Sequence, residues 1–276
     1  MAFFILASRK RKTLSEQDPL ICRMAPYAYS FRFFPCDPCL CRSQQRTIRS
    51  PFSLGIDSRM RYGAVFSIEV HTPVNKILIL FAHPRFEKSR INRALLSRVD
   101  QIPGVTLHDL YERYPDFNVD VEQEQELMTA HQIIIWHHPF YMYGAPALLK
   151  QWIDLVLEYG WAHGRGGDSL KGRIIFNALT TGGSREVYTA DGYNRFTLRE
   201  FLAPFDQTAT LCKMVYLPPF AVQGTHLLTE AQLARHAALY HTLLERLSQE
   251  DFSPESMKRF PLLNDWLDHG SEAPES

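Results

Sequence analysis

The stretch Lys76-Ile-Leu-Ile-Leu-Phe-Ala82 is a continuous apolar run, and it sets the fold class of the chain. Continuous runs are typical of strands in a parallel sheet, because such strands are buried on both faces. Further strands are predicted at Val105-Thr-Leu-His-Asp109, at Gln132-Ile-Ile-Ile-Trp136, at Arg173-Ile-Ile-Phe-Asn-Ala-Leu179, and from Leu211 to Tyr216, the last closed by Pro218-Pro219.

Helical patterns separate these strands. We expect helices from near Ser89, from about Asp120 to Ala130, between Pro146 and Gly160, from about Asn194 to Ala203, and from Thr229 onward. Proline is tolerated in a first helical turn and glycine favours a helix end, which fits Pro146 and Gly160. Thr229 and Gln232 have the spacing of a capping box.

Five strands that alternate with five helices predict a doubly wound α/β fold, with a five-stranded parallel sheet covered by helices on both faces. Ligands bind such sheets beyond the carboxyl ends of the strands, at the topological switch point. The loops that follow Ala82, Trp136 and Leu179 are therefore the places to look for a site.

The charge of the chain is unevenly distributed. The chain has 276 residues and a formal net charge of zero, but residues 1–75 carry eleven Lys/Arg against five Asp/Glu. The remainder carries nineteen Lys/Arg against 25 Asp/Glu. Because phosphate binding needs a concentrated basic face, a nucleic-acid partner is not expected. We expect residues 1–75 to be a disordered basic extension, 76–250 to be the folded domain, and 251–276 to be a C-terminal tail.

Four of the five cysteines precede residue 42. A zinc or cluster site is suggested by Cys36, Cys39 and Cys41, with Cys22. Structural zinc sites usually pair two short ligand turns, however, and this segment contains only one such turn. No metal is assigned. Cys212 is expected in an apolar strand, which would raise the pKa of its thiol.

No apolar stretch approaches the length of about 20 residues that spans a bilayer. The first residues, MAFFILASRKRK, place the apolar run before the basic residues, which is the reverse of a signal peptide. A cytoplasmic location is therefore expected.

The loop after the first strand contains no glycine, which excludes the dinucleotide-binding fingerprint and the P-loop. His83, Ser89 and Asn92 offer polar donors near a helix start, where a phosphate is favoured. The alternative is that Ser89 only caps the helix, and the two roles are compatible.

The loop after the third strand places Phe140, Tyr141 and Tyr143 within four positions. A planar ligand lying against the loop explains the cluster, and a packed corner of the core is the alternative. The preceding His137 and His138 point to opposite faces if they continue the strand, so a metal shared between them is not expected.

The loop after the fourth strand is Thr180-Thr-Gly-Gly183. Paired glycines let a backbone approach a ligand closely, and amides there would stabilise charge beside N1 of an isoalloxazine ring. A further segment, from Gly160 to Gly167, is a lid, a partner contact or a surface connection.

These residues resemble a known family. The resemblance covers roughly residues 76–250 and rests on Ala82-His83-Pro84 with Ser89 and Asn92, Tyr114-Pro-Asp-Phe117, His138-Pro139 through Pro146, Leu148-Leu-Lys-x-Trp-Ile-Asp154, Gly160-Trp161-Ala162 and Thr180-Thr-Gly-Gly183. It is to the NAD(P)H quinone oxidoreductases of the flavodoxin-like superfamily. Within them, the chain is especially similar to the ancillary subunits of bacterial glutathione-gated potassium efflux systems.

The resemblance implies a flavodoxin-like sheet of order 2-1-3-4-5 and a homodimer with two non-covalent flavin sites. The flavin is FMN, with FAD as the alternative, and the co-substrate is NADH or NADPH. Flavin contacts are carried over to His83, Ser89, Arg90, Ile91, Asn92, Phe140, Tyr141, Met142, Tyr143, Thr180, Thr181, Gly182 and Gly183.

One departure from the family concerns proton transfer. In the animal quinone reductases a Tyr follows the Thr-Thr-Gly-Gly run, and a His lies six residues further on. Tyr188 matches the Tyr and is the expected catalytic residue, but Asn194 occupies the His position. An amide side chain cannot carry a proton as imidazolium can, so slow turnover is expected.

The expected activity is two-electron hydride transfer from NAD(P)H through FMN to a quinone or similar electrophile. The alternative is a mainly regulatory subunit that binds a membrane potassium efflux protein, peripheral on the cytoplasmic face of the inner membrane, with incidental redox activity. An electron-transfer flavodoxin is disfavoured, because the first loop lacks that group's Thr/Ser-Gly pattern.

Overall fold

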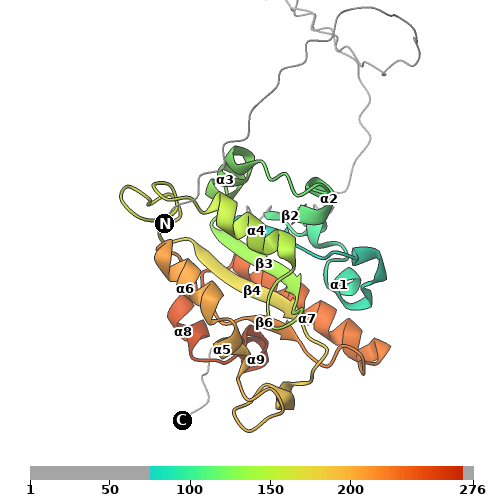
Figure 1. The fold of residues 1–276 in the computed structure, drawn as a ribbon. Coiled ribbons are helices and arrows are strands. Elements are labelled where there is room, and N and C mark those ends of the chain that lie inside the picture. The colour runs from blue at the N-terminus through green and yellow to red at the C-terminus, as the bar shows by residue number, and fades with distance from the viewer. Residues whose placement is uncertain (1–74, 270–276) are drawn as a thin grey trace, which may run out of the picture. The chain divides into compact units, whose positions relative to one another are not determined.

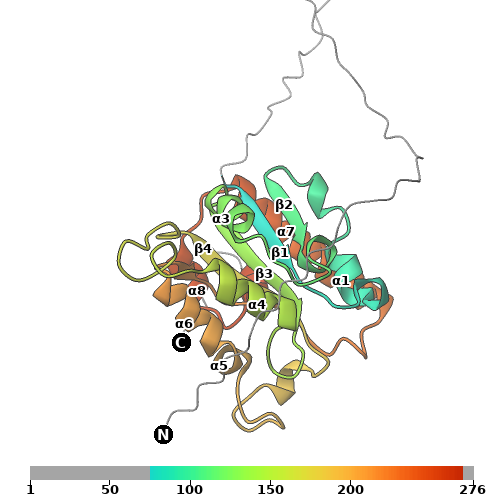
Figure 2. The same cartoon turned by 45° about the horizontal axis from the view of Figure 1, so that its top comes forward.

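The computed structural model describes residues 75–269, which include a single parallel sheet. Its strands are β1 (Ile77–Phe81), β2 (Val105–Asp109), β3 (Ile133–Pro139), β4 (Ile174–Thr180), β5 (Val215–Tyr216) and β6 (Phe220–Val222). The strand order is β2-β1-β3-β4-β5, and every pairing is parallel. Figures 1 and 2 together show β1 to β4 side by side. The predicted flavodoxin-like order 2-1-3-4-5 is confirmed.

Helices cover both faces of the sheet. They are α1 (Arg90–Leu95), α2 (Leu110–Arg113), α3 (Val121–Thr129), α4 (Ala147–Val156), α5 (Leu198–Phe201), α6 (Ala203–Leu211), α7 (Glu230–Gln249), α8 (Pro254–Lys258) and α9 (Leu263–His269). The helices from α2 to α6 lie over one face, and α1, α7, α8 and α9 lie over the other (Figures 1 and 2).

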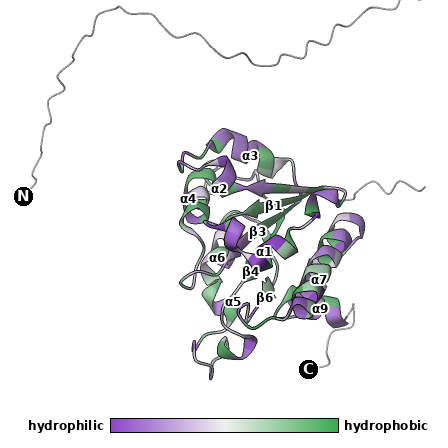
Figure 3. Cartoon of the chain, turned by 90° about the vertical axis from the view of Figure 1, so that its right-hand side faces the viewer, coloured by the Kyte–Doolittle hydropathy of each residue, from purple (hydrophilic) through white to green (hydrophobic). Residues whose placement is uncertain are grey.

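The continuous apolar run of β1 fills two cores at once. Leu78 and Leu80 belong to the cluster under α3, α4 and α6, whereas Ile77, Ile79 and Phe81 belong to the cluster under α1 and α7. All five side chains are fully buried. Alternate residues of a strand face opposite sides, so a strand between two helical layers must be apolar throughout (Figure 3).

Two expectations for residues 194–216 were wrong. In place of one helix over 194–203, the chain turns at Arg195 and forms α5 from the capping box of Thr197 and Glu200. Pro204 then lies in the first turn of α6, where its missing N–H costs nothing. Leu211 ends α6, and Cys212 is its C-terminal cap, so Cys212 is not in a strand. Burial nevertheless raises the pKa of its thiol to about 11.

The fifth strand position is occupied by two short pieces. β5 pairs with the start of β4 and β6 pairs with its end, so Pro218-Pro219 interrupts this edge and does not close it. Proline has no N–H to donate to a ladder, which explains the break between the pieces.

The segment after residue 250, expected as a tail, contains α8 and α9. Their buried side chains Met257, Phe260, Leu263 and Trp266 belong to the same core cluster as α7. Asn264 also pairs with the backbone of Ala221 in β6, accepting from its N–H at 2.9 Å and donating to its C=O at 3.1 Å. Residues 251–269 therefore pack into the folded domain.

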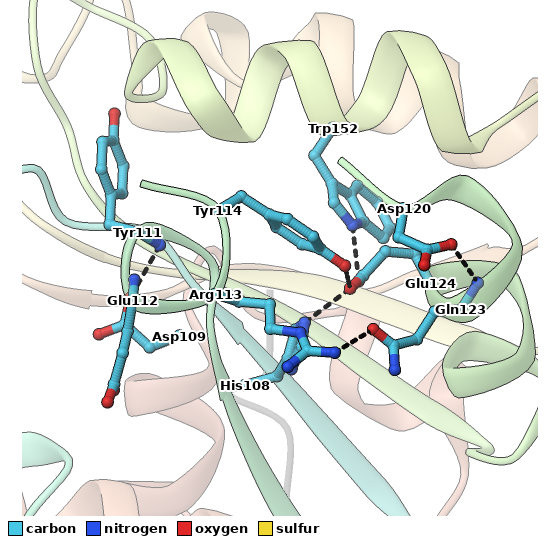
Figure 4. Close-up of polar contacts among 10 residues, drawn as sticks. All are labelled: His108, Asp109, Tyr111, Glu112, Arg113, Tyr114, Asp120, Gln123, Glu124 and Trp152. Carbon is cyan, nitrogen blue, oxygen red and sulfur yellow. Dashed lines mark hydrogen bonds and ion pairs between the residues drawn. The ribbon is translucent and has the colours of Figure 1, made fainter. Parts of the chain in front are cut away.

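A buried carboxylate joins β2, α3 and α4. Glu124 accepts hydrogen bonds from His108 at 2.7 Å, Tyr114 at 2.6 Å and Trp152 at 2.8 Å (Figure 4). Burial alone would raise the pKa of this carboxyl, but the three donors outweigh it and lower that pKa. The network fixes the Tyr114-Pro-Asp-Phe117 segment against the helices.

The N-terminal extension and its four cysteines lie outside residues 75–269, as does the end of the expected tail. Within the described part of the chain, no group of three or more His, Cys, Asp or Glu side chains has the arrangement of a metal site. No helix between residues 75 and 269 is both long enough and apolar enough to cross a bilayer.

Candidate functional site

A cavity of about 460 Å³ lies at the carboxyl ends of β1, β3 and β4. Nine of the residues expected at a ligand site line it: His83, Ser89, Arg90, Ile91, Asn92, Phe140, Tyr141, Thr180 and Gly182. The structure therefore brings together residues from all three loops, because the carboxyl ends of parallel strands converge at one edge.

Ser89 lines the cavity between Lys88 and Arg90 in the chain. Its Oγ accepts from the backbone N–H of Asn92 at 3.3 Å and from the Asn92 side-chain amide at 2.9 Å, so Ser89 is the cap of α1. An oxygen that accepts these bonds still has its own proton to donate. The cap therefore leaves Ser89 able to bind a ligand.

The lining of the cavity is basic. It includes Arg85, Lys88 and Arg90 and contains no Asp or Glu. The Arg90 guanidinium bonds Glu230 at 3.0 Å and the Leu228 carbonyl at 2.6 Å, which holds the α1 loop to α7. No described acidic side chain forms an ion pair with Arg85 or Lys88, so both cations remain available to an anionic ligand.

His83 is nearly buried and links two walls of the cavity. Its Nδ1 accepts from the backbone N–H of Arg85 at 3.0 Å, and its Nε2 lies 3.3 Å from the Tyr141 hydroxyl. Burial lowers the pKa of this imidazole. The neutral ring therefore carries its proton on Nε2 and donates it toward Tyr141.

The aromatic loop divides into two parts. Phe140 and Tyr141 line the cavity, but Met142 and Tyr143 do not. Met142 is 90% exposed, and Tyr143 stacks on Phe201 with ring centroids 5.0 Å apart. Both adopt left-handed backbone, with φ of 46° and 64°, which is uncommon for residues other than glycine. This turn presents Phe140 and Tyr141 inward and Met142 outward.

The two glycines of the third loop meet different neighbours. A Cβ on Gly182 would lie 3.1 Å from Nε2 of His226, within the cavity. A Cβ on Gly183 would lie 2.8 Å from Val187 and 3.1 Å from the Tyr188 ring, outside the cavity lining. Thr181 turns back and donates to the Gly183 carbonyl at 2.6 Å.

Tyr188 is not part of the lining of the cavity. Its ring centroid is 6.0 Å from that of Phe140 and 6.1 Å from that of Phe201. Burial raises the pKa of its hydroxyl, so Tyr188 keeps its proton at neutral pH. Asn194 accepts from the Tyr143 hydroxyl at 3.4 Å and does not line the cavity either.

Thr225 and His226 line the cavity but were not predicted. They follow β6, which was not predicted, because the expected fifth strand ends at Pro218-Pro219. A signal was present in the apolar run Phe220-Ala-Val222, which is followed by Gln-Gly-Thr-His226. The segment from Gly160 to Gly167 does not line the cavity.

Comparison with known proteins agrees with this arrangement. The family model described as a flavodoxin-like fold matches residues 75–245. The glutathione-regulated potassium-efflux system ancillary protein KefG of Pectobacterium atrosepticum is 45% identical over 165 residues, which cover 60% of this chain and 90% of that protein.

Two solved structures are also similar. The general stress protein 14 of Treponema denticola, in complex with FMN, is 38% identical with a TM-score of 0.59, covering 63% of this chain and 99% of that one. An NADPH-quinone reductase from P. pentosaceus is 32% identical with a TM-score of 0.57, covering 61% and 97%. The chain belongs to the flavodoxin-like family.

Proposed function

We propose that this protein is a flavin-dependent NAD(P)H:quinone oxidoreductase that binds FMN in the cavity beyond β1, β3 and β4. The observation that carries the proposal is the mixed lining of that cavity. It combines cations and hydroxyl groups, without any carboxylate, with Phe140, Tyr141 and the backbone of Gly182. A ligand with a phosphate at one end and a planar ring at the other matches both.

The chain's own residues would then bind and orient the cofactor. Arg85 and Lys88 would neutralise the phosphate, and the Ser89 and Thr180 hydroxyls would donate to it. Phe140 and Tyr141 would lie against the ring, and Gly182 would let the backbone approach it. Bound FMN would supply the hydride transfer between nicotinamide and quinone, chemistry that no side chain provides.

Tyr188 is proposed as the donor of a hydrogen bond to the oxygen of the acceptor. The raised pKa keeps its hydroxyl protonated, as this role requires. The ring is next to Gly183, where an added Cβ would lie 3.1 Å from it. The relatives support the redox proposal, since one solved structure holds FMN and another is named an NADPH-quinone reductase.

The test is the identity and activity of the bound cofactor. Protein purified without added flavin is expected to release FMN, identified by mass and absorbance spectrum, and to oxidise NADH or NADPH when a quinone is supplied. The same assays separate FMN from FAD and NADH from NADPH. Protein that neither contains nor binds flavin would overturn the proposal.

A second function is supported by the 45% identity to the KefG ancillary protein. In this proposal a homodimer binds a membrane potassium efflux protein from the cytoplasmic face and activates it. Tyr188→Phe keeps the ring that packs on Phe140 but removes the hydroxyl, so it should bind FMN with reduced turnover. If this variant still activates potassium efflux in cells, binding is the main role; a parallel loss of efflux and turnover would favour catalysis.

A further inference from the structure

Two adjacent histidines on β3 each belong to a buried hydrogen-bond chain, on opposite faces of the sheet. His137 Nε2 lies 3.0 Å from Asn92 Oδ1, and His137 Nδ1 lies 3.0 Å from the Tyr240 hydroxyl. His138 Nε2 lies 3.0 Å from the Asn177 side-chain amide nitrogen, and the Tyr216 hydroxyl donates to Asn177 Oδ1. Both chains therefore contain a histidine, an asparagine and a tyrosine.

The direction of the His137 chain follows from its donors and acceptors. The Asn92 amide nitrogen faces two hydroxyl oxygens, so Asn92 Oδ1 must accept, and His137 must donate from Nε2. Nδ1 of His137 then accepts from Tyr240. Burial lowers the pKa of His137 to about 3, which keeps the ring neutral and this arrangement intact at neutral pH.

The chain ends on two side chains that line the cavity. The Asn92 amide donates to Ser89 Oγ at 2.9 Å and to Thr180 Oγ1 at 3.4 Å. Ser89 precedes α1 and Thr180 ends β4, so one buried amide joins two walls. Neither hydroxyl donates to a described group, and each has its oxygen engaged by Asn92, which leaves its proton for a ligand in the cavity.

We propose that Tyr240 and His137 are positioning residues for the phosphate of the bound cofactor. They hold the Asn92 amide so that the Ser89 and Thr180 hydroxyls donate into the cavity. His137 and Tyr240 are fully buried and do not line the cavity, so they act through Asn92 and the two hydroxyls. The inference rests on the proposed function, because it takes FMN as the ligand.

The His138 chain provides a matched control. Tyr216 is also a partly enclosed tyrosine that donates to a buried asparagine, but its chain includes no side chain that lines the cavity. Tyr240→Phe and Tyr216→Phe thus each remove one hydroxyl from a comparable network. In Tyr240→Phe the aromatic ring itself is retained, and with it the packing against Phe220, whose ring centroid is 5.0 Å away.

The experiment uses flavin fluorescence to measure the Kd with which flavin-free protein binds FMN and riboflavin. Riboflavin lacks the phosphate of FMN. Tyr240→Phe is expected to weaken FMN binding by about tenfold, the effect of losing roughly one well-placed hydrogen bond, and to leave riboflavin binding unchanged. Tyr216→Phe is expected to change neither. Thr180→Val, which keeps a branched side chain without the hydroxyl, should show the same selective loss.

Equal weakening of FMN and riboflavin would mean that the chain is merely structural and would overturn the inference. Unchanged FMN binding in both Tyr240→Phe and Thr180→Val would overturn it as well. Failure of the native protein to bind FMN would instead overturn the proposed function, and this inference with it, so the two failures are distinguishable.

Discussion

At the scale of single residues, Gly183 leaves room for the Tyr188 ring because glycine has no side chain. The Cβ of Gly183→Ala would lie 2.8 Å from Val187 and 3.1 Å from the Tyr188 ring, which is closer than Cβ atoms normally approach. The Tyr188 ring must then move. Because misplacement by about 1 Å can cost up to about a hundredfold in rate, quinone turnover should fall markedly while FMN stays bound.

Steady-state kinetics and the flavin absorbance of the purified variant check this prediction. Gly144→Ala is the control, since a Cβ there meets nothing within 4 Å. Loss of the flavin absorbance in Gly183→Ala would instead place Gly183 against the cofactor and contradict the role of Tyr188.

At the scale of elements, Glu124→Gln tests how α3 is held. The new amide group would face either Trp152 or the pair of His108 and Tyr114, and each of these sides supplies a donor. One buried donor would lose its acceptor, at a cost of about 1–3 kcal/mol in the free energy of unfolding. Thermal unfolding should detect this loss, and Glu126→Gln, at an exposed position on the same helix, should show none.

The loss should depend on pH with a definite sign. The folded-state pKa of Glu124 lies below the ordinary value of 4.5, so its stabilisation is complete above that value and disappears as the pH falls through the folded pKa. The difference in unfolding free energy between the native protein and Glu124→Gln should therefore shrink below about pH 4.5. A difference that is constant with pH would exclude the carboxylate as its source.

The elements that could be predicted were those with a strong local pattern. Val105–Asp109 was predicted to the residue, and the capping box of α7 marked its start. β5 and β6 have two and three residues, too few to show a period, so Thr225 and His226 were missed. The helix around Glu124 was predicted, but the burial of Glu124 was not, because its three donors come from other elements of the chain.

The cavity could be predicted from the sequence, because the convergence of strand ends is a property of the fold. The buried hydrogen bonds behind the cavity could not be predicted. Nothing local to Tyr240 indicates that its hydroxyl reaches His137, which is 103 positions away in the chain. Met142 and Tyr143 were carried over to the site from the resemblance to the quinone oxidoreductases. A left-handed turn leaves Met142 exposed and places Tyr143 against Phe201, and neither lines the cavity.

At the scale of the whole molecule, the burial of α8 and α9 places the end of the folded domain beyond residue 250. Met257, Phe260, Leu263 and Trp266 are between 0% and 7% exposed. Burying a large apolar side chain contributes about 1.5–3 kcal/mol, so the four together contribute roughly 6–12 kcal/mol. That is comparable with the total stability of a typical domain, about 5–15 kcal/mol.

A chain that ends at Gln249 is therefore expected to lose cooperative thermal unfolding or to accumulate as insoluble protein. It would expose the apolar face of α7 and also leave Ala221 of β6 without the side chain of Asn264. A chain that ends at His269 is the control, because it keeps every residue that the structure describes. If the shorter chain unfolds at the same temperature as the control and binds FMN equally well, the contribution of α8 and α9 to the core is negligible and the domain ends near residue 250.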